Sequence, residues 1–144
     1  MAKNVQDHFT PEVPGLVIVT HGRWGEELLK SAEMIAGEME QVVAISLAAG
    51  EEPLEYQRRI TRVLETLPEG SVVFADLLGG TPCNCSAALS KKYSIGIVSG
   101  VNLPMLLEAL CLRQSLSGEE LAAALVGAGR EGIQNVLSVL SEVV

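Results

Sequence analysis

The sequence contains very few aromatic residues. Phe, Trp and Tyr together make up 3% of the 144 residues, although 48% of the chain is hydrophobic. The core must therefore be built mainly from Ala, Val, Leu and Ile, a composition typical of a parallel β-sheet covered by helices on both faces. The length and the apolar fraction suit one compact domain.

Positive charge and long apolar runs are also scarce. The 10 Lys and Arg residues are outnumbered by 18 Asp and Glu residues, and the formal net charge is −8. This balance argues against a polyanionic partner such as nucleic acid or an anionic membrane surface. The longest apolar run lies near residues 15–20 and is far shorter than the roughly 20 residues of a membrane helix. We therefore expect a soluble protein that binds no nucleic acid.

The N-terminal residues lack the features of a targeting signal. The stretch MAKNVQDHFTPEVP has no apolar core segment and ends with two prolines, so it does not resemble a signal peptide. We predict that residues 1–14 form a flexible tail, with His8 exposed, and that residues 15–144 form the single domain. With three cysteines, an odd number, and no secretion signal, reduced thiols and a cytoplasmic location are expected.

The cysteines do not form a metal-binding pattern. Cys83 and Cys85 are two residues apart on a predicted helix, so their thiols should point to opposite sides and cannot readily share an ion. Cys111 lies on an apolar face of another predicted helix. We interpret all three as structural cysteines and expect no metal site.

Four short runs rich in β-branched residues predict strands, and each is followed by a helical pattern. The strands are expected at residues 15–20, 41–47, 71–77 and 93–99. The first helix should begin at Trp24, with Trp24, Leu28, Ala32 and Ile35 on one stripe; the second begins at Pro53, the third has Thr81 as its N-cap with Pro82 following, and the fourth begins near Pro104.

A last helical stripe runs from Leu121 to Leu140. Three glycines within it, Gly127, Gly129 and Gly132, each cost about 1 kcal/mol relative to Ala in an exposed helix. Either this helix is interrupted or its backbone packs close to a neighbour. The alternation of strands and helices predicts a single-domain, doubly wound α/β fold with a mainly parallel sheet, about four strands in the order 2-1-3-4, and helices on both faces.

One histidine and one carboxylate should meet at the carboxyl edge of this sheet, where ligands bind in such folds. His21 follows the first strand and Asp76 ends the third, and the order 2-1-3-4 makes these strands neighbours. A carboxylate beside an imidazole fixes its tautomer and leaves the second nitrogen free to attack. An alternative is that His21 is only a polar residue at a strand end.

Two sets of backbone amides could bind a phosphate near His21. Gly22 opens the turn before the first helix, whose N-terminus favours anions. Gly79 and Gly80 in the GGTP loop allow a close approach of the backbone. The combination suggests a histidine that accepts a phosphoryl group, which requires positioning and charge stabilisation but no metal or cofactor.

Three segments together carry a family resemblance: IVTHGRWGEELLKSAEMIAGE, FADLLGGTPCNCSA and SGVNLPMLLEAL. In this order they resemble the IIA component of the mannose, fructose and sorbose class of the bacterial phosphoenolpyruvate-dependent sugar phosphotransferase system. The resemblance covers Gly15 to about Leu140. The chain departs from some members in having Leu77 and Leu78 where they carry a bulky aromatic after the aspartate.

The resemblance implies a phosphocarrier. It would take a phosphoryl group from the histidine phosphocarrier protein onto His21, oriented by Asp76, with Thr81 lining the pocket, and pass it to a IIB component. The IIB component then phosphorylates sugar entering through a membrane complex, which this chain would serve only indirectly. The resemblance also implies a homodimer. Because the chain ends where a IIA domain would end, the IIB component is expected to be a separate protein.

Two other functions remain open at the level of sequence. A regulatory or binding domain of the same fold could use phosphorylation only as a signal. A small hydrolase could use His21 and Asp76 as acid and base, but no serine or cysteine occupies an obvious nucleophile elbow.

Overall fold

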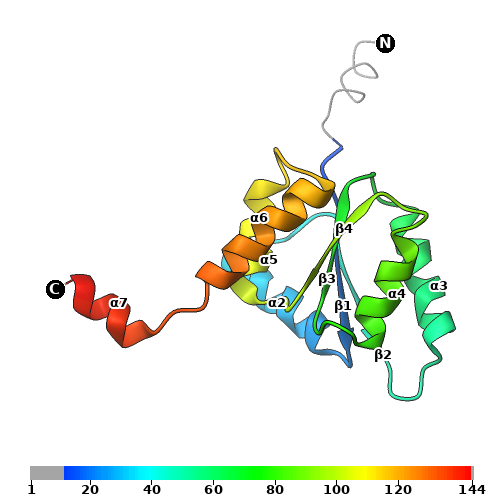
Figure 1. Ribbon diagram of the computed structural model, residues 1–144, viewed down its shortest axis with the longest axis horizontal. Helices are drawn as coiled ribbons and strands as arrows, with labels where there is room; N and C mark the ends of the chain where they lie inside the picture. Colours follow the sequence, from blue (N-terminus) through cyan, green and yellow to red (C-terminus); the bar gives the residue numbers. More distant parts are fainter. Residues whose placement is uncertain (1–11, 144) are drawn as a thin grey trace, which may run out of the picture.

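A four-stranded parallel sheet forms the centre of the computed structural model, which describes residues 12–143 (Figure 1). The strands are β1 (Leu16–His21), β2 (Val42–Leu47), β3 (Ser71–Ala75) and β4 (Ile95–Ser99), and the helices are α2 (Trp24–Ala36), α3 (Pro53–Leu64), α4 (Thr81–Leu89), α5 (Leu103–Leu112), α6 (Gly118–Glu131) and α7 (Val136–Val143). The strand order is β2-β1-β3-β4, and every neighbouring pair is parallel. The predicted fold class and strand order are confirmed.

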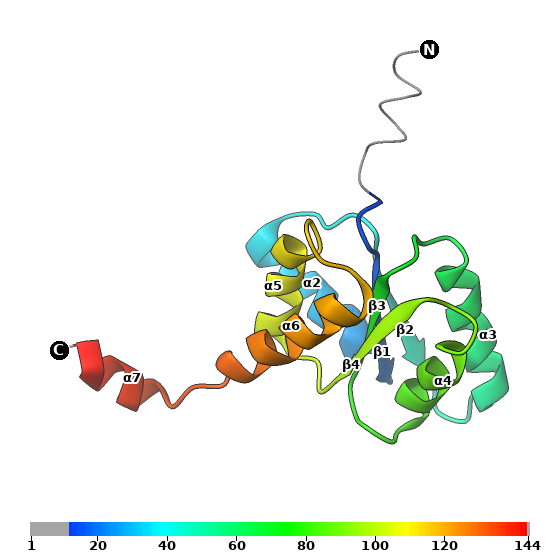
Figure 2. The same cartoon turned by 45° about the horizontal axis from the view of Figure 1, so that its top comes forward.

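The two faces of the sheet carry different helices (Figure 2). Alternate residues of β1 point to opposite faces, and Leu16, Val17, Ile18 and Val19 are all fully buried. On one face Leu16 and Ile18 pack with α2, α5 and α6. On the other face Val17 and Val19 pack with α3 and α4. Burial on both faces explains why β1 reads as an unbroken apolar run.

Helix α2 packs on the sheet through part of the predicted stripe, Leu28 and Ala32, but not through its two ends. Ala32 is fully buried, but Ile35 is 64% exposed and Trp24 is 42% exposed, so the predicted burial of Ile35 is wrong. Gly25 allows the close approach, because a Cβ there would lie 2.8 Å from the Thr20 hydroxyl oxygen.

Two element boundaries next to the sheet edge differ from their predictions. β3 ends at Ala75 instead of residue 77, because the Asp76 carboxylate turns to hydrogen-bond with His21. Gly80 is the N-cap of α4 instead of Thr81, which is the first helical residue, followed by Pro82.

The last predicted helical stripe is interrupted. α6 ends at Glu131 and α7 begins at Val136. Two of the glycines also pack closely, since a Cβ on Gly129 would lie 2.6 Å from the Met105 methyl carbon and one on Gly132 would lie 2.5 Å from Pro104. Both proposed explanations for the glycines therefore hold at different positions, while Gly127 faces open space.

The predicted tail of residues 1–14, including His8, lies mostly outside the described residues. The two tail residues next to the domain accept hydrogen bonds: Val13 from the Gln41 side chain at 2.8 Å and Pro14 from Arg113 at 3.3 Å. Between residues 12 and 143, no helix has the length and apolar character needed to cross a membrane.

The cysteines divide into two groups. Cys83 and Cys85 are buried in the layer formed by α3 and α4, and the Cys85 thiol donates to the carbonyl of Pro53 at 3.4 Å. Cys111 is exposed. Its predicted place on a packed apolar face is wrong because that side of α5 has no covering element among the described residues.

Tyr56 provides a measurable anchor between α3 and β2. Its fully buried ring carries a hydroxyl that donates to the carbonyl of Ile45 at 2.6 Å, and burial raises the pKa of this phenol well above its ordinary value. Tyr56→Phe removes this hydrogen bond from the core, so we expect a loss of about 0.5–1.5 kcal/mol in the free energy of unfolding. Urea unfolding measures it, and an unchanged midpoint would contradict the assigned bond.

Candidate functional site

His21 and Asp76 form a hydrogen-bonded pair at the carboxyl edge of the sheet. The His21 Nδ1 lies 2.9 Å from Asp76 Oδ2, and the His21 backbone N–H donates to the same oxygen at 2.8 Å. The two residues are 55 positions apart in the sequence and meet because β1 and β3 are neighbours in the sheet. As an ionised carboxylate only accepts, Nδ1 must carry the proton.

The pair is asymmetric in its exposure to solvent. The His21 side chain is 48% exposed, whereas that of Asp76 is 9% exposed. Among the described residues, Nε2 of His21 makes no hydrogen bond, and Asp76 Oδ1 is buried without a partner. This arrangement leaves the Nε2 lone pair free, while the carboxylate accepts a hydrogen bond from Nδ1 on the other side of the ring.

The hydrogen bonds from His21 hold Asp76 in its charged form. Burial is the largest single effect, and it raises the pKa of the carboxyl. The hydrogen bonds from the His21 amide and imidazole together lower the pKa by more than burial raises it, so the pKa of Asp76 lies below its ordinary value of 3.8. Asp76 is therefore a charged acceptor at neutral pH.

Gly80 gives the imidazole its place against the start of α4. A Cβ on this residue would lie 2.6 Å from Cε1 of His21 and 3.3 Å from Nε2. Gly80 itself has an extended backbone conformation with φ −81°, so its need for glycine is steric. The sequence predicted Gly80 only as an amide donor, and this contact was missed.

The start of α4 supplies amide donors beside the imidazole. The N–H groups of a first helical turn have no acceptor within the helix, and here they belong to Thr81 and Cys83, because Pro82 has none. The amide of Asn84 is the first to bond within this turn, to the carbonyl of Gly80 at 2.9 Å. Gly79 adopts φ +87° in the loop that leads to this turn, which favours glycine.

The sequence predicted that the amide of Gly22, in the turn after His21, binds a phosphate, but this amide has another acceptor in the structure. The Gly22 amide donates to the carbonyl of Leu47 at 2.8 Å, so in this structure it is already engaged. Thr20, which is buried, accepts from the Gly25 amide at 3.2 Å and donates to the Gly22 carbonyl at 3.0 Å. Sequence reasoning missed this use of Thr20; a polar residue at the end of an otherwise apolar strand was the available signal.

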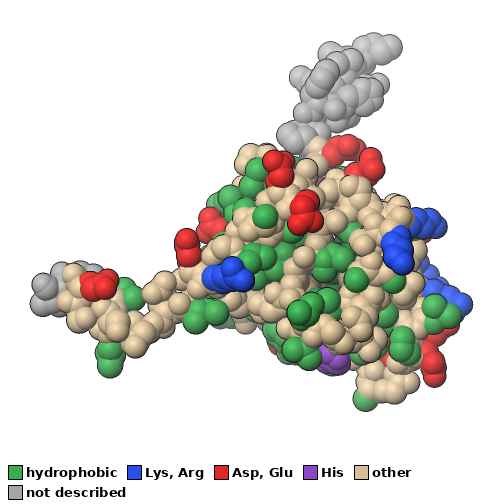
Figure 3. Space-filling view, viewed as in Figure 1, with side chains coloured by type: hydrophobic (Ala, Val, Ile, Leu, Met, Phe, Trp, Pro, Cys, Tyr) green, Lys and Arg blue, Asp and Glu red, His purple; other side chains and the backbone are tan. Residues whose placement is uncertain are grey.

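The surface around the pair is largely apolar. Figure 3 shows the one described histidine at the surface with hydrophobic side chains near it. Trp24, at the start of α2, and Leu77 and Leu78, which follow Asp76 in the chain, are exposed. Arg23 forms an exposed ion pair with Glu26 at 3.4 Å. Residues 12–143 contain no group of three or more His, Cys, Asp or Glu side chains suited to a metal ion.

A methyl group on Gly80 should displace the imidazole. In Gly80→Ala the new Cβ would overlap Cε1 of His21, so we expect the ring to shift and the rate at which it accepts a phosphoryl group to fall at least about tenfold, as a small misplacement of reacting groups does. Intact-mass analysis of the folded chain over the time course of phosphoryl transfer measures this rate.

Gly79→Ala is the matched control for this change. Its Cβ would meet nothing within 4 Å, although φ +87° makes the substitution strained. Equal losses in the two variants, at equal stability, would show that backbone strain rather than contact with the ring is responsible.

The lowered pKa of Asp76 predicts a pH-dependent contribution to stability. A carboxyl whose pKa is lower in the folded chain stabilises the fold above its unfolded-state pKa, and this contribution is lost as the pH falls through the folded-state value. The difference in unfolding free energy between the wild type and Asp76→Asn should thus be complete above about pH 5 and shrink as the pH is lowered below about 4. Urea titrations measure it; a difference that stays constant would contradict the pairing.

Comparison with known protein families places the chain among sugar phosphotransferase components. A family model described as "PTS system fructose IIA component" matches residues 15–126. The mannose-specific EIIAB component of Escherichia coli strain K12 is 38% identical over 125 residues, which cover 83% of this chain but 38% of the relative. The chain thus spans about two fifths of the length of this curated relative. The fructose-specific EIIA component of Bacillus subtilis strain 168 is 32% identical over 122 residues, covering 83% of this chain and 84% of the relative.

Solved structures give the same result. The phosphotransferase system component EIIA of Streptococcus agalactiae matches with a TM-score of 0.80 and 36% identity, covering 86% of this chain and 98% of that one. The mannose/sorbose-specific IIA subunit of Enterococcus faecalis matches with a TM-score of 0.77 and 33% identity, covering 85% and 93%. The chain therefore belongs to the IIA components of the mannose, fructose and sorbose class of the phosphoenolpyruvate-dependent sugar phosphotransferase system.

Proposed function

We propose that the chain is a phosphocarrier, a phosphotransferase that accepts a phosphoryl group from the histidine phosphocarrier protein on Nε2 of His21 and passes it to a IIB component. The observation that supports this most directly is the 2.9 Å contact between Nδ1 of His21 and Asp76 Oδ2, with Nε2 exposed. Family membership supports the general role, and the geometry supports the choice of atom.

The proposed step is a balanced exchange between two histidines. The Nε2 lone pair of His21 attacks the phosphorus on the donor, the new N–P bond forms as the donor's N–P bond breaks, and the donor imidazole leaves. The proton on Nδ1 of His21 remains in place, so the phosphorylated ring carries positive charge that the Asp76 carboxylate stabilises. No metal, cofactor or water is consumed in this step.

The residues around Nε2 fit a transferred phosphoryl group. Because Gly80 brings the imidazole over the start of α4, a group on Nε2 would lie beside the free amides of Thr81 and Cys83 and the positive end of the helix. The Thr81 hydroxyl is a further donor in our proposal, and Gly79 and Gly80 shape the loop. Gly22 would join this site only if its amide left the carbonyl of Leu47.

The apolar rim suits contact with partner proteins. Trp24 follows His21 by three residues, Leu77 and Leu78 follow Asp76 directly, and all three side chains are exposed. Exposed apolar residues that gather in one patch mark protein interaction sites. We propose that the histidine phosphocarrier protein and a IIB component dock here in turn, and that the IIB component serves a membrane sugar transporter. We also propose that the protein works in the cytoplasm and forms a homodimer.

Incubation with phosphoenolpyruvate, enzyme I and the histidine phosphocarrier protein tests the proposal. Intact-mass analysis of the wild-type chain should show one added phosphoryl group that is lost in acid, because a phosphorylated imidazole is acid-labile. Addition of a IIB component should then remove the group. A folded wild-type chain that gains no mass would contradict the proposal, and one that gains it but passes it to no IIB component would favour a regulatory domain.

A further inference from the structure

Thr20 and His21, the last two residues of β1, contact opposite layers of the molecule. Successive side chains of a strand alternate between the two faces of a sheet. His21 lies against Gly80 at the start of α4, whereas a Cβ on Gly25 in α2 would lie 2.8 Å from Oγ1 of Thr20. Thr20 is 1% exposed, so neither a phosphoryl group nor a partner protein can touch it. Any effect of Thr20 on the reaction must pass through the turn that carries His21.

The Thr20 hydroxyl closes the turn between His21 and α2. It donates to the carbonyl of Gly22 at 3.0 Å and accepts from the amide of Gly25 at 3.2 Å. A hydroxyl carries one proton and two lone pairs, so it can make both hydrogen bonds at once. Valine has nearly the shape of threonine but can make neither bond, whereas serine can make both.

The residue that follows His21 has both of its backbone polar groups in hydrogen bonds. Gly22 adopts φ +62°, its amide donates to the carbonyl of Leu47 at 2.8 Å, and its carbonyl accepts from Thr20. On the other side, the His21 amide donates to Asp76 at 2.8 Å. Without the Thr20 hydroxyl the Gly22 carbonyl is free to rotate, and the backbone of His21 rotates with it.

We propose that Thr20 is a positioning residue for phosphoryl transfer. Its hydroxyl fixes the peptide after His21, so that Nε2 lies in line with the phosphorus while Nδ1 stays on Asp76. The inference rests on the proposed function and leaves its chemistry unchanged: the N–P bond forms on Nε2 as the donor's N–P bond breaks, and no proton moves to or from Thr20.

Single-turnover transfer from the phosphorylated histidine phosphocarrier protein, at several donor concentrations, tests this role. In Thr20→Val the maximal rate should fall at least about tenfold, as it does when reacting groups are slightly misplaced. The donor concentration that gives half of this rate should not change, because a buried residue makes no contact with the donor. Thr20→Ser should react within about threefold of the wild type, since it retains the hydroxyl. A wild-type rate in Thr20→Val, or equal losses in Thr20→Val and Thr20→Ser, would overturn the proposal.

Gly25→Ala tests the same contact from α2, with Thr20 itself unchanged. The new methyl would lie 2.8 Å from Oγ1 of Thr20 and should push the hydroxyl away from the Gly22 carbonyl. Transfer should then slow as it does in Thr20→Val. A folded Gly25→Ala chain that transfers at the wild-type rate would contradict the proposal.

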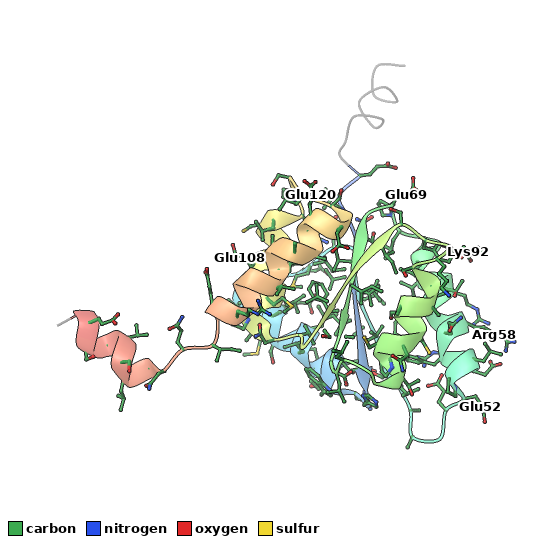
Figure 4. The ribbon with its side chains drawn as sticks, viewed as in Figure 1. Glu52, Arg58, Glu69, Lys92, Glu108 and Glu120 are labelled. Carbon is green, nitrogen blue, oxygen red and sulfur yellow. The ribbon has the colours of Figure 1, made fainter. Side chains whose placement is uncertain are left out.

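Ser71 offers a matched control at the opposite edge of the sheet. Its hydroxyl is buried, accepts from the amide of Gly15 at 2.8 Å and donates to the carbonyl of Pro68 at 2.7 Å. Ser71 begins β3, whereas His21 ends the parallel strand β1. Figure 4 shows Glu69, just before β3, and Glu52, in the connection after β2, at opposite ends of the molecule.

Ser71→Ala removes a buried hydroxyl with the same two kinds of hydrogen bond, but far from the reacting atoms. It should lower the free energy of unfolding, as Thr20→Val does, and still transfer at the wild-type rate. A loss of rate in Ser71→Ala as large as that in Thr20→Val would assign both losses to destabilisation of the fold and overturn the proposal.

NMR of the unphosphorylated chain reports the position of the His21 ring without any transfer. With ¹⁵N-labelled histidine and His8→Ala in every sample, the two ring signals belong to His21 alone. In alkaline buffer Thr20→Val should move the Nδ1 and Nε2 signals toward each other, because a ring that leaves Asp76 mixes its two tautomers. Thr20→Ser and Ser71→Ala should match the chain with threonine and serine in place.

The ring signals also separate this inference from the proposed function. Signals that stay unchanged in Thr20→Val would contradict the positioning role, whatever the transfer rates. A wild-type chain that gains no phosphoryl group would contradict the proposed function, while the movement of the signals would still decide whether Thr20 positions His21.

Discussion

A chain carrying His21→Ala should accept no phosphoryl group while keeping its fold. The loss is expected to be complete, because Nε2 of His21 is the proposed attacking atom and its removal leaves no nucleophile at the carboxyl edge of β1. The imidazole is half exposed and makes one hydrogen bond among the described residues, to Asp76, whose second bond comes from the His21 backbone amide and stays in the variant. Its removal should therefore cost the fold little. Intact-mass analysis after incubation with phosphoenolpyruvate, enzyme I and the histidine phosphocarrier protein measures the effect.

His8 provides the control for this experiment. It is the other histidine of the chain, and His8→Ala should be phosphorylated as the wild type is. Circular dichroism of both variants should match the wild type. Phosphorylation of a folded His21→Ala chain would exclude His21 as the acceptor.

Asp76→Asn should slow phosphoryl acceptance by on the order of 10²–10³-fold, the usual cost of removing one preorganised electrostatic contact. The amide has nearly the shape of the carboxylate but no charge, so it cannot stabilise the positive charge that develops on the ring. Asparagine can also present its NH₂ group to Nδ1, which would favour the wrong tautomer. Single-turnover rates with phosphorylated histidine phosphocarrier protein separate this chemical effect from weaker docking.

Glu27→Gln is a suitable control for the loss of one negative charge. Glu27 lies in the first turn of α2, is exposed, and within residues 12–143 pairs with Lys30 alone, at 3.0 Å. Its neutralisation should change the rate by less than about threefold, since exposed ion pairs contribute little. Similar losses for Asp76→Asn and Glu27→Gln would show that net charge, rather than contact with His21, governs the reaction.

The fold could be predicted from the sequence because its strands are buried on both faces. Residues 16–19 are fully buried, which requires the unbroken apolar run that marks a parallel strand. The pairing of His21 with Asp76 could also be predicted, because parallel strands end at one edge of the sheet and β1 and β3 are neighbours. This prediction required the order of the strands in the sheet, which was inferred from the regular alternation of strands and helices.

Features that depend on side-chain contacts across the chain could not be predicted in this way. The glycine pair before Thr81 indicated a close approach of backbone, but not that the atom approaching Gly80 is Cε1 of His21. Engagement of the Gly22 amide by Leu47 depends on the end of β2. The apolar spacing from Leu121 to Leu140 is helical throughout, and it contains no sign that the second half leaves the domain.

The nitrogen that carries the phosphoryl group tests the account most directly. NMR of the phosphorylated chain with ¹⁵N-labelled histidine distinguishes the two ring nitrogens by their shifts and by coupling to phosphorus. Because Nδ1 holds a proton shared with Asp76 Oδ2 at 2.9 Å, the phosphoryl group should be found on Nε2 of His21. A phosphoryl group on Nδ1 would mean that the contact with Asp76 breaks before transfer, and the mechanism derived from this geometry would be wrong.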